Sequence, residues 1–529
     1  MPQLSARSPR AFLIPIVFVA GLCSIVYELL ISTTSSYFLG DSVTQFSLTI
    51  GVYLASMGVG SWLSKFIGER LTVSFVIIEL LLGLVGGAAV PLLYYAYTVF
   101  SPGGYQAFML GLTAVVGLLT GFEIPLLARA LTHHYPLREN LANVLSLDYI
   151  GALAATLLFP FLLLPAFGLF RTSAAVGMVN ILLGIGVLLF LPAASGAAGP
   201  GRRTVKKLLV AALLSLVGFA ALLVASRTLL DRWEAATYPH DLVYGEQTPY
   251  QALALTRNGE EVRLYINHVI QFSSTDEYRY HESLALIPAG AVADPGPRSV
   301  LVLGGGEGLL ARELLRLPAV TAITIVDLDP AVFALARSHA ALREINEEAL
   351  ADPRVTTIGT DAAQFLRTDT AHYDLVIADL PDPGNEAVAR LYSTQFFGLA
   401  RARLLPGGVF ATQGTSPFHT QNAYWCIYET LRAAGFAYVY PYHTNVPSFG
   451  EWGFFLALDR PVDPRSYRPT GREQYLDSGL LPELFYFARD LRHPGELGIN
   501  TLDRPRLLDY YLDDWRRWQR SLQTVEPGA

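Results

Sequence analysis

The hydrophobic positions of this chain follow two patterns, which change near residue 230. Before that point, seven apolar runs are each long enough to supply the ~20 residues that a membrane-spanning helix requires. The runs cover roughly residues 12–33, 46–62, 73–100, 107–131, 141–167, 173–193 and 208–225. After that point, short apolar runs alternate with glycine-rich turns and amphipathic stretches. The pattern predicts a transmembrane helical domain of about seven spans over residues 1–230, followed by a part of soluble character.

Composition supports this division and limits the classes of partner. Hydrophobic residues make up 52% of the 529 residues and charged residues 16%, which is too apolar for a soluble protein of this length. Arg7 and Arg10 precede the first run and no small-residue cleavage site follows it, so we expect an anchor, not a removed signal peptide. We therefore predict a multi-pass protein of the cell membrane, in contact with the lipid bilayer. The net charge of −7 argues against a nucleic-acid partner.

Acidic residues interrupt the apolar runs. Four acids lie within them or at their edges: Glu28, Glu79, Glu123 and Asp148. An ionised carboxylate in hydrocarbon costs ~2.5–3.5 kcal/mol even on the lenient insertion scale, so such residues usually face a partner or a wet cavity. One interpretation is a polar path or pocket for a cation. The simpler one is that the acids pair with Arg129, Arg138 or backbone groups and lock the bundle.

The soluble part begins with a predicted hairpin and ends with predicted helices. Residues 250–270 alternate between apolar and polar positions and break at Asn258-Gly259, a strong hairpin signal, so we expect a small β-subdomain over residues 231–290. The tail, residues 461–529, has helical spacing at 481–492 and 506–522 and is predicted to be a helical extension. The default role for this tail is packing on the catalytic domain, and a dimer contact or a membrane-surface helix are the alternatives that the pattern leaves open.

Between these parts, residues 291–460 read as a Rossmann-like α/β domain of the methyltransferase type. The apolar run Val300–Leu303 is followed by a glycine turn at Gly304, Gly306 and Gly308, then by a helical stretch and a second apolar run that ends in Asp327. In nucleotide-binding βαβ units, glycines let the backbone approach the ligand, and an acid at the tip of the next strand can take two ribose hydroxyls. The stretch therefore predicts a nucleoside site.

Further acids follow the predicted strands of this domain. The five acids at such strand ends are Glu307, Asp327, Asp361, Asp379 and Asp382. In open parallel sheets, ligands bind beyond the carboxyl ends of the strands, so these side chains should converge on one crevice. Helix capping explains one or two of them but not all five. Because like charges repel one another, the set predicts a cationic substrate.

Motifs along this soluble part carry a resemblance to a known family. The matching pieces are Tyr250-Gln251, Gln271 with Asp276-Glu277 and Tyr280-His281-Glu282, Gly304-Gly305-Gly306, Asp379 with Asp382-Pro383 and Leu391-Tyr392, Gln413, Ser416-Pro417-Phe418, and Tyr442 with Val446-Pro447. In this order, the soluble part resembles the polyamine aminopropyltransferases, that is, the spermidine synthase family. The whole chain resembles the membrane-fused members of that family.

The resemblance implies a reaction and a role for each matched residue. The expected activity transfers an aminopropyl group from decarboxylated S-adenosylmethionine, as co-substrate, to a diamine such as putrescine, giving spermidine and methylthioadenosine. Asp379 is expected to be the catalytic proton acceptor. The expected donor-binding residues are Gln251, Gly304, Gly306, Asp327 and Asp361, and the expected polyamine-binding residues are His281, Glu307, Asp382, Tyr280 and Tyr442. We expect no metal, no prosthetic group and a homodimer.

The chain departs from the family pattern in the acceptor region, and two other functions stay open. Glu307 stands where the family usually has Asp, and Asp382-Pro383 continues as Gly-Asn-Glu on the loop expected to close over the substrates. One alternative is a membrane methyltransferase that uses intact S-adenosylmethionine, although it leaves Tyr280-His281-Glu282 without a role. The other is a polyamine transporter or sensor without turnover, which the intramembrane acids favour.

Sidedness is the last open point, because two indications conflict. In and beside the predicted loops, ten lysines and arginines fall on the N-terminal side of the bundle and three on the opposite side. Since cytoplasmic loops carry an excess of Lys and Arg, this places the N-terminus in the cytoplasm and, after seven spans, the soluble part outside it. An adenosyl sulfonium, by contrast, is expected in the cytosol. We follow the charge distribution and predict an external catalytic domain.

Overall fold

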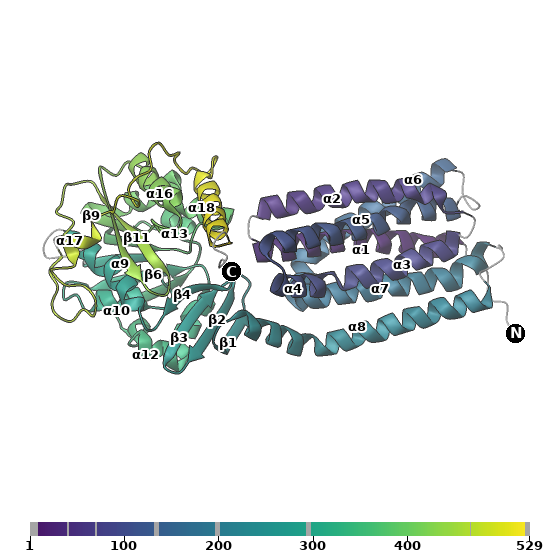
Figure 1. Cartoon of the computed structure of the whole chain (residues 1–529), viewed down its shortest axis with the longest axis horizontal. Coiled ribbons are helices and arrows are strands. Elements are labelled where there is room, and N and C mark those ends of the chain that lie inside the picture. The colour runs from purple at the N-terminus through teal and green to yellow at the C-terminus, as the bar shows by residue number, and fades with distance from the viewer. Residues whose placement is uncertain are drawn as a thin grey trace, which may run out of the picture. The chain divides into compact units, whose positions relative to one another are not determined.

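The computed structural model describes residues 9–39, 42–68, 71–131, 137–195, 201–292, 298–465 and 467–523. The chain divides into two compact units, Met1–Thr237 and Tyr238–Ala529. The first unit is a bundle of helices and the second is an α/β unit that contains both sheets (Figure 1). Each unit is described by itself below.

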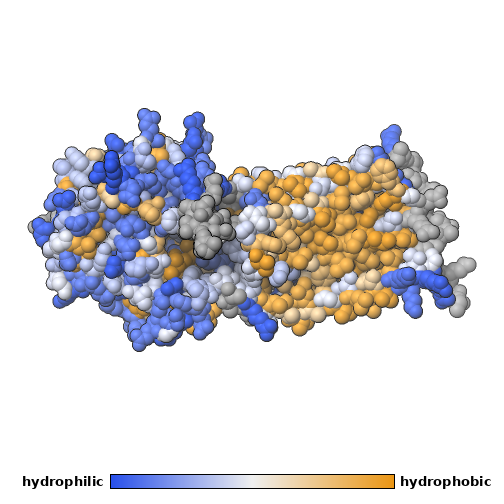
Figure 2. Space-filling model, in the orientation of Figure 1, coloured by the Kyte–Doolittle hydropathy of each residue, from blue (hydrophilic) through white to orange (hydrophobic). Residues whose placement is uncertain are grey.

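The first unit, called the helical unit here, presents apolar side chains at its surface. Its helices are α1 (Pro9–Leu39), α2 (Ser42–Leu63), α3 (Leu71–Gly87), α4 (Ala89–Val99), α5 (Pro102–Leu131), α6 (Leu137–Leu158), α7 (Leu164–Ser195) and α8 (Arg202–Thr237). Figure 2 shows hydrophobic residues covering most of the visible surface of this unit. Val224, Phe161 and Leu214 are 87%, 79% and 68% exposed. Such a surface suits lipid, because contiguous apolar patches of this size are rare on soluble proteins.

Five of the described helical stretches are long and apolar enough to cross a membrane, and a sixth is added if α3 and α4 form one span. The pair α3–α4 is bent by 43° at the break between Gly87 and Ala89. One stretch, Leu141–Leu189, is 49 residues long, which is more than twice the length of a single span. The predicted number of seven spans remains a prediction.

Close helix approach in this unit depends on glycines. A Cβ atom at Gly121 of α5 would overlap the backbone of Met57 in α2, and one at Gly117 would lie 2.7 Å from the Tyr53 carbonyl oxygen. On the other side of the bundle, Gly83 of α3 faces the backbone of Gly177 in α7. Small residues let helices in lipid approach closely enough for backbone-to-backbone packing. The charged residue Arg129 donates to the carbonyl groups of Ser64 and Ile67 near the end of α2.

The second unit, called the synthase unit here, begins with a four-stranded antiparallel sheet. Its strands are β1 (Asp241–Gln247), β2 (Ala252–Asn258), β3 (Glu261–Ile266) and β4 (Val269–Ser273), in the order β1-β2-β3-β4. The turn between β2 and β3 lies at Gly259, whose φ of 60° suits glycine. The predicted hairpin is confirmed.

A seven-stranded sheet follows, in the order β10-β11-β9-β8-β5-β6-β7. Its strands are β5 (Ser299–Gly304), β6 (Ala322–Asp327), β7 (Val355–Gly359), β8 (Tyr373–Asp379), β9 (Leu404–Gln413), β10 (Tyr438–Val446) and β11 (Gly450–Leu458). Strands β5 to β9 run parallel, whereas β11 and β10 are antiparallel additions at one edge. This arrangement confirms the predicted Rossmann-like domain preceded by a β-subdomain.

Helices cover both faces of the seven-stranded sheet. They are α9 (Glu277–Ala291), α10 (Leu309–Leu315), α11 (Pro330–Ser338), α12 (Ala340–Ile345), α13 (Ala362–Thr368), α14 (Glu386–Ala389), α15 (Thr394–Ala402) and α16 (Gln421–Ala433). Alternate residues of β5 enter different cores. Val300 and Val302 pack with α9 and α10, and Leu301 and Leu303 pack with α13, α15 and α16. Both faces of β5 are therefore buried, which explains its continuous apolar run.

The tail packs on the synthase unit through α18 (Arg506–Gln523). Asp514 accepts hydrogen bonds from the backbone N–H and the side-chain amide of Asn422 at the start of α16. The helix predicted over 481–492 is wrong beyond α17 (Leu481–Leu484). There, side chains of α16 use the backbone carbonyl groups instead: Gln421 donates to those of Asp490 and Arg492, and Trp425 to that of Leu491.

Candidate active site

The glycine turn brings two strand ends into direct contact. Gly304 ends β5 with a φ of 89°, and a Cβ atom there would overlap the carbonyl oxygen of Asp379 at the end of β8. Gly305 and Gly308 also have positive φ, at 65° and 87°. Glycine is the residue that adopts this conformation without steric strain. The sequence of the turn therefore lets the backbone of the loop and the end of β8 share one small space.

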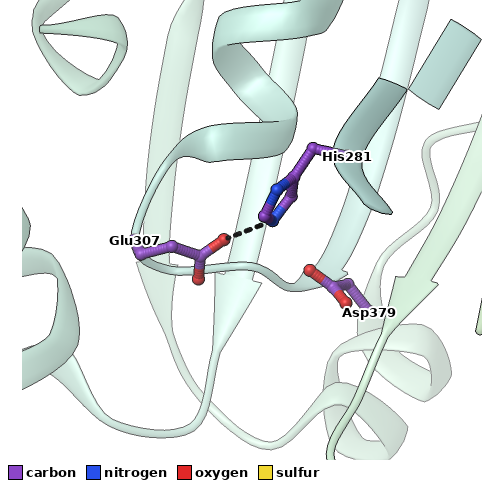
Figure 3. A group of neighbouring side chains, drawn as sticks. All are labelled: His281, Glu307 and Asp379. Atoms are coloured by element: carbon purple, nitrogen blue, oxygen red, sulfur yellow. Dashed lines mark ion pairs between the residues drawn. The ribbon is translucent and has the colours of Figure 1, made fainter. Parts of the chain in front are cut away.

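Three predicted residues meet at this point. His281 comes from α9, Glu307 from the glycine loop and Asp379 from the end of β8, and one ligand atom of each lies within 4.8 Å of the others. His281 Nε2 is 3.7 Å from Glu307 Oε1. Figure 3 shows the three side chains pointing toward one another. The set also has the donor types of a metal site, so any cation, organic or metallic, would find ligands here.

Tyr280 and Glu277 hold the acid and the histidine in place. The Tyr280 hydroxyl donates to Asp379 Oδ1 at 2.6 Å. One turn earlier on α9, Glu277 Oε2 is 2.8 Å from His281 Nδ1, which turns Nε2 toward Glu307. Arg312 on α10 donates to both oxygens of Glu277 at 2.7 and 2.9 Å. Sequence reasoning gave Glu277 no role, although its i, i+4 spacing from His281 was a visible signal.

Burial and mutual repulsion dominate the electrostatics of this cluster. Burial, with the charge of Asp379 next, raises the pKa of Glu307 to about 7. Burial also raises the pKa of Asp379, against the opposing effects of His281 and the Tyr280 hydroxyl. For His281, burial alone would lower the pKa, but Glu277 and the surrounding acids raise it above its ordinary value. The site therefore favours bound positive charge.

Asp327 lies at the end of β6, beside the glycine loop. Its Oδ1 accepts a hydrogen bond from the backbone N–H of Asp329 at 3.0 Å. A Cβ atom on Gly306 would lie 2.8 Å from Asp327 Oδ2, so the missing side chain makes room for this carboxylate. Burial raises the pKa of Asp327 to about 6. The predicted pairing of a glycine loop with an acid on the next strand is present.

Gln251 lies in the turn between β1 and β2, and this turn contacts the start of α11 through Thr248. The backbone of the turn closes between Thr248 and Gln251, and Thr248 Oγ1 donates to Asp329 Oδ2 at 2.7 Å. Asp329 also caps α11 by accepting from the backbone N–H of Ala331. Sequence reasoning missed Thr248 and Asp329. Because they are far apart in the chain, only the packing of the two sheets reveals their contact.

Asp361 is occupied by protein groups on both carboxylate oxygens. Oδ1 caps α13 by accepting from the backbone N–H of Gln364 at 2.9 Å, and Oδ2 forms an ion pair with Arg390. Tyr442 packs on Phe454, as Tyr280 does. Its ring is fully buried against Phe454 and its hydroxyl donates to the Ser283 carbonyl oxygen.

Asp382 lies on the loop after β8 and contacts the tail. Its Oδ2 accepts a hydrogen bond from the Tyr511 hydroxyl of α18 at 2.9 Å, and its Oδ1 is buried without a partner among the described residues. Burial raises its pKa to about 6, while Tyr511 and Gln413 act in the opposite direction. The unmatched Gly-Asn-Glu sequence has a local explanation, because Asn385 caps α14 through the backbone N–H of Val388.

The structure combines a Rossmann-like sheet with a glycine loop, an acid on the neighbouring strand and a buried acidic cluster, which is the arrangement expected of a nucleoside-binding site for a cationic ligand. Residues 277–463 match the spermine/spermidine synthase domain. The chain is 40% identical over 514 residues to Polyamine aminopropyltransferase 2 of Ralstonia nicotianae, covering 96% of this chain and 98% of that protein. Polyamine aminopropyltransferase of Leptospira interrogans is 40% identical over 505 residues, covering 95% and 98%.

The chain therefore belongs to the polyamine aminopropyltransferases, the spermine/spermidine synthase family. A solved structure of spermidine synthase from Thermotoga maritima is 23% identical with a TM-score of 0.43, covering 47% of this chain and 87% of that chain. The family membership covers both units, since the matched relatives align over almost the full length. It supports the aminopropyltransferase interpretation over the methyltransferase and over the non-catalytic transporter or sensor.

Proposed function

We propose that this protein transfers the aminopropyl group of decarboxylated S-adenosylmethionine to a diamine such as putrescine, giving spermidine and methylthioadenosine. The observation that carries the proposal is the enclosed cluster of His281, Glu307 and Asp379, which lies directly against the glycine loop. Aminopropyl transfer brings a sulfonium and an amine together, and both are cations before the reaction. At ~4 Å two such charges repel by about 4 kcal/mol at an effective dielectric constant of 20, and nearby carboxylates offset that repulsion.

The donor would lie along the carboxyl ends of β5, β6 and β7. We assign the ribose hydroxyls to Asp327, the backbone approach to Gly304 and Gly306, the methionine-derived end to Gln251, and the adenine amino group to Asp361. The Asp327 carboxylate lies over Gly306, which has no side chain. This arrangement is consistent with room for the ribose beside Asp327. The assignment of Asp361 requires its carboxylate to bind the nucleoside in addition to Arg390, or to release that arginine.

The acceptor would lie on the other side of the cluster. We assign its amines to Glu307, His281, Asp379 and Asp382, with Tyr280 and Tyr442 as channel residues. Tyr442 would act by supporting the channel wall, since its hydroxyl is bound to the Ser283 backbone. Tyr511 joins this set, because its hydroxyl holds one oxygen of Asp382 and leaves the other without a partner among the described residues.

Asp379 would take the proton that the acceptor amine must lose. An alkylamine has a pKa near the ~10.4 of lysine, so it arrives protonated and cannot attack. Among the described residues, Tyr280 is the hydrogen-bond donor to Asp379 and binds Oδ1, which leaves Oδ2 to accept from the amine. The amine nitrogen then forms a bond to the carbon beside the sulfonium, and the C–S electron pair stays on sulfur. The leaving group is a neutral thioether, so the step requires no acid.

The test is a product analysis with the full-length protein. Purified protein is incubated with decarboxylated or intact S-adenosylmethionine and a panel of diamines and polyamines, and the nucleoside product is identified by mass spectrometry. We expect methylthioadenosine, formed only with the decarboxylated donor and an amine. Adenosylhomocysteine from the intact cofactor would overturn the proposal in favour of methyl transfer. If neither donor gave a product, the proposal would be overturned in favour of a protein that binds polyamine without catalysis.

Glu307 is expected to discriminate between the two cofactors. Intact S-adenosylmethionine carries a carboxylate that would meet the like charge of Glu307 in a buried site. We predict that the wild type binds intact S-adenosylmethionine weakly and that Glu307→Gln binds this intact cofactor about tenfold more tightly. Calorimetry measures both affinities. Glu344→Gln, at an exposed position of α12, is the matched control.

The same variant changes the pH dependence of donor binding. Because the pKa of Glu307 is raised to about 7, the free protein carries a neutral Glu307 below that pH and a carboxylate above it. Affinity for the cationic donor should therefore rise between pH 6 and 8 in the wild type and rise less steeply in Glu307→Gln, where Asp327 and Asp379 still titrate with raised pKa values. Equal affinity of the wild type for both cofactors at pH 8 would contradict this role.

For the helical unit, we propose seven membrane crossings. The 49-residue stretch Leu141–Leu189 would form two of them, because its backbone leaves the helical conformation at Gly168, where φ is 68° and ψ is 176°. Thr172 Oγ1 donates to the Leu163 carbonyl oxygen across this break, which is consistent with a reversal of the chain. With an odd number of crossings, the N-terminus and the synthase unit lie on opposite sides of the membrane.

Thiol labelling tests this topology. In a background without Cys23 and Cys426, single thiols are introduced as Lys65→Cys, in the second predicted N-terminal-side segment, and Asp503→Cys, at an exposed position of the synthase unit. A membrane-impermeant maleimide should label only one of the two in intact cells. The charge distribution predicts that the labelled one is Asp503→Cys. Labelling of both or neither would mean an even number of crossings, and labelling of Lys65→Cys alone would place the synthase unit in the cytoplasm.

A further inference from the structure

Four helices bring unpartnered oxygen atoms into the interior of the helical unit. The side chains are Tyr27 of α1, Glu79 of α3, Glu123 of α5 and Asn180 of α7, and none is more than 3% exposed. Each has a buried oxygen without a hydrogen-bond partner among the described residues: Tyr27 Oη, Glu79 Oε1, Glu123 Oε1 and Asn180 Oδ1. Buried polar atoms are nearly always hydrogen-bonded in native proteins, so four in one region require an explanation.

These side chains belong to one cluster. Asn180 Nδ2 donates to Glu79 Oε2 at 2.8 Å, which fixes the Asn180 carbonyl oxygen beside the Glu79 carboxyl group. Glu79 and Glu123 are close enough for their carboxyl groups to share a hydrogen bond. Tyr27 lies within electrostatic reach of both acids, and its ring packs on Gly86, two turns along α3 from Glu79. The cluster will be called the intramembrane acceptor cluster.

The intramembrane acceptor cluster offers more hydrogen-bond acceptors than donors. Its donors are the Tyr27 hydroxyl and the Asn180 amide, which already donates to Glu79 Oε2. A single proton shared by the two carboxyl groups would remove one charge, but it would leave the Asn180 carbonyl oxygen without a partner. Burying an unpaired carboxylate is costly, and so is burying an unpaired amide oxygen. A cation with three hydrogen-bond donors would satisfy three of these oxygens at once: Glu79 Oε1, Glu123 Oε1 and Asn180 Oδ1. A primary ammonium group is such a cation, since it has three donors.

The surroundings favour an organic ammonium over a bare metal ion. Neighbouring positions of the same helices, such as Val26, Leu30 and Leu82, are fully buried apolar side chains packed in the same core as Tyr27. These side chains supply no oxygen ligands, and the nearby Ser24, Tyr53 and Thr120 hydroxyls are already hydrogen-bonded to one another. Hard metal cations, by contrast, collect about six oxygen ligands. Apolar walls do match the methylene chain of an alkylamine. The face of the Tyr27 ring can also attract an ammonium group.

Two interruptions of regular helix lie near the cluster. The break between α3 and α4 follows Glu79 by about two turns and bends the pair by 43°. In α5, Pro125 stands two residues after Glu123 and cannot donate to the carbonyl group one turn earlier, at Gly121. Discontinuous helices at such depth are the places where transporters bind their cations. They also supply the flexibility that an enclosed site requires for entry and exit.

We propose that the intramembrane acceptor cluster binds the terminal ammonium group of a polyamine within the helical unit. This would give the protein a second amine site, distinct from the cluster of His281, Glu307 and Asp379 in the synthase unit. The chemical class of the amine follows from the proposed function, because the synthase unit uses and releases alkylamines. The existence of a cation site rests on the acceptor geometry alone.

Carbodiimide labelling of the full-length protein in detergent or nanodiscs tests the site directly. Dicyclohexylcarbodiimide modifies protonated carboxyl groups in apolar surroundings, and peptide mapping by mass spectrometry identifies the modified residue. We expect an acylurea adduct at Glu79 or Glu123 that spermidine or putrescine suppresses at least tenfold, whereas NaCl of equal ionic strength does not. Glu139, at the exposed start of α6, is the control carboxyl group. Replacement of the adduct by an amide of the added amine would also support the site.

Two outcomes overturn the proposal. Suppression by Na⁺ and not by amines would assign the cluster to a metal ion. Labelling that no cation suppresses would assign it to a structural carboxyl pair that shares a proton. The volume-conserving variant Asn180→Leu should reduce amine protection at Glu79 about tenfold while its melting temperature reports that it folds. Methylthioadenosine formation is measured on the same samples, so loss of the intramembrane site is distinguishable from failure of the proposed activity.

Discussion

Asp379→Asn is expected to lower turnover by ~10²-fold or more while leaving donor binding largely intact. The variant keeps the size of the side chain and keeps an oxygen that can accept from Tyr280, so the end of β8 should retain its structure. What it removes is the carboxylate oxygen that takes the proton of the acceptor amine. A removed acid–base group typically reduces turnover by 10²–10⁴-fold. The measurement is the steady-state rate of methylthioadenosine formation with saturating donor and amine.

The control and the ligand dependence make this result specific. Asp503→Asn, at a position with a 95% exposed side chain, should behave as the wild type. Calorimetry with decarboxylated S-adenosylmethionine should give an affinity within about threefold of the wild type, because an effect confined to turnover is the signature of a group that acts in the transition state. Turnover near the wild-type value would remove Asp379 from the mechanism and direct attention to Glu307.

The sheet and the acids at its strand ends were predictable because each depends on local pattern. The run Val300–Leu303 is short, apolar and bounded by glycines, and the fold buries both of its faces. Acids placed directly after parallel strands must meet at one edge of the sheet, whatever the strand order. Glu307 and Asp379 could therefore be grouped before their contacts were known, whereas His281 of α9 was added only through the family resemblance.

The contacts that support this cluster depend on strand order and helix packing, which no local pattern contains. Arg312 reaches Glu277 because α10 packs on α9, and Tyr511 reaches Asp382 because α18 packs beside the loop after β8. Residues separated by 35 and 129 positions leave no periodic signal. The helix expected over 481–492 failed for a related reason, since residues 490–492 are bound by Gln421 and Trp425 of α16, which lie far away in the chain.

The two proposed amine-binding sites differ in how well they are enclosed. In the synthase unit, the acids stand at strand ends and the side chain of Glu307 is 14% exposed. In the helical unit, Glu79 and Asn180 are fully enclosed, so a cation can be exchanged only if helices move. The break between α3 and α4 is the element whose bending would provide that motion. Both units would then handle the same class of molecule at different rates.

Gly304→Ala is expected to lower turnover at least ~10²-fold and to destabilise the synthase unit. A Cβ atom at this position would overlap the Asp379 carbonyl oxygen, and its φ of 89° is strained for any residue with a Cβ atom. The two effects together should cost roughly 3 kcal/mol or more, as judged from typical costs of overpacking and of strained backbone. To relieve the overlap, β5 and β8 would have to separate, and this would move Asp379 away from His281 and Glu307.

Thermal unfolding and turnover measure this prediction together. For Gly304→Ala we expect a melting transition lower by several degrees and methylthioadenosine formation at least ~10²-fold slower, with weakened donor binding, which separates it from Asp379→Asn. Gly398→Ala is the matched control, because a Cβ atom there meets nothing within 4 Å. In the interior of α15, alanine is more favourable than glycine by about 1 kcal/mol, so this variant should not be destabilised. If Gly304→Ala kept both the stability and the turnover of the wild type, the close approach of the glycine loop to β8 would have no role in forming the site.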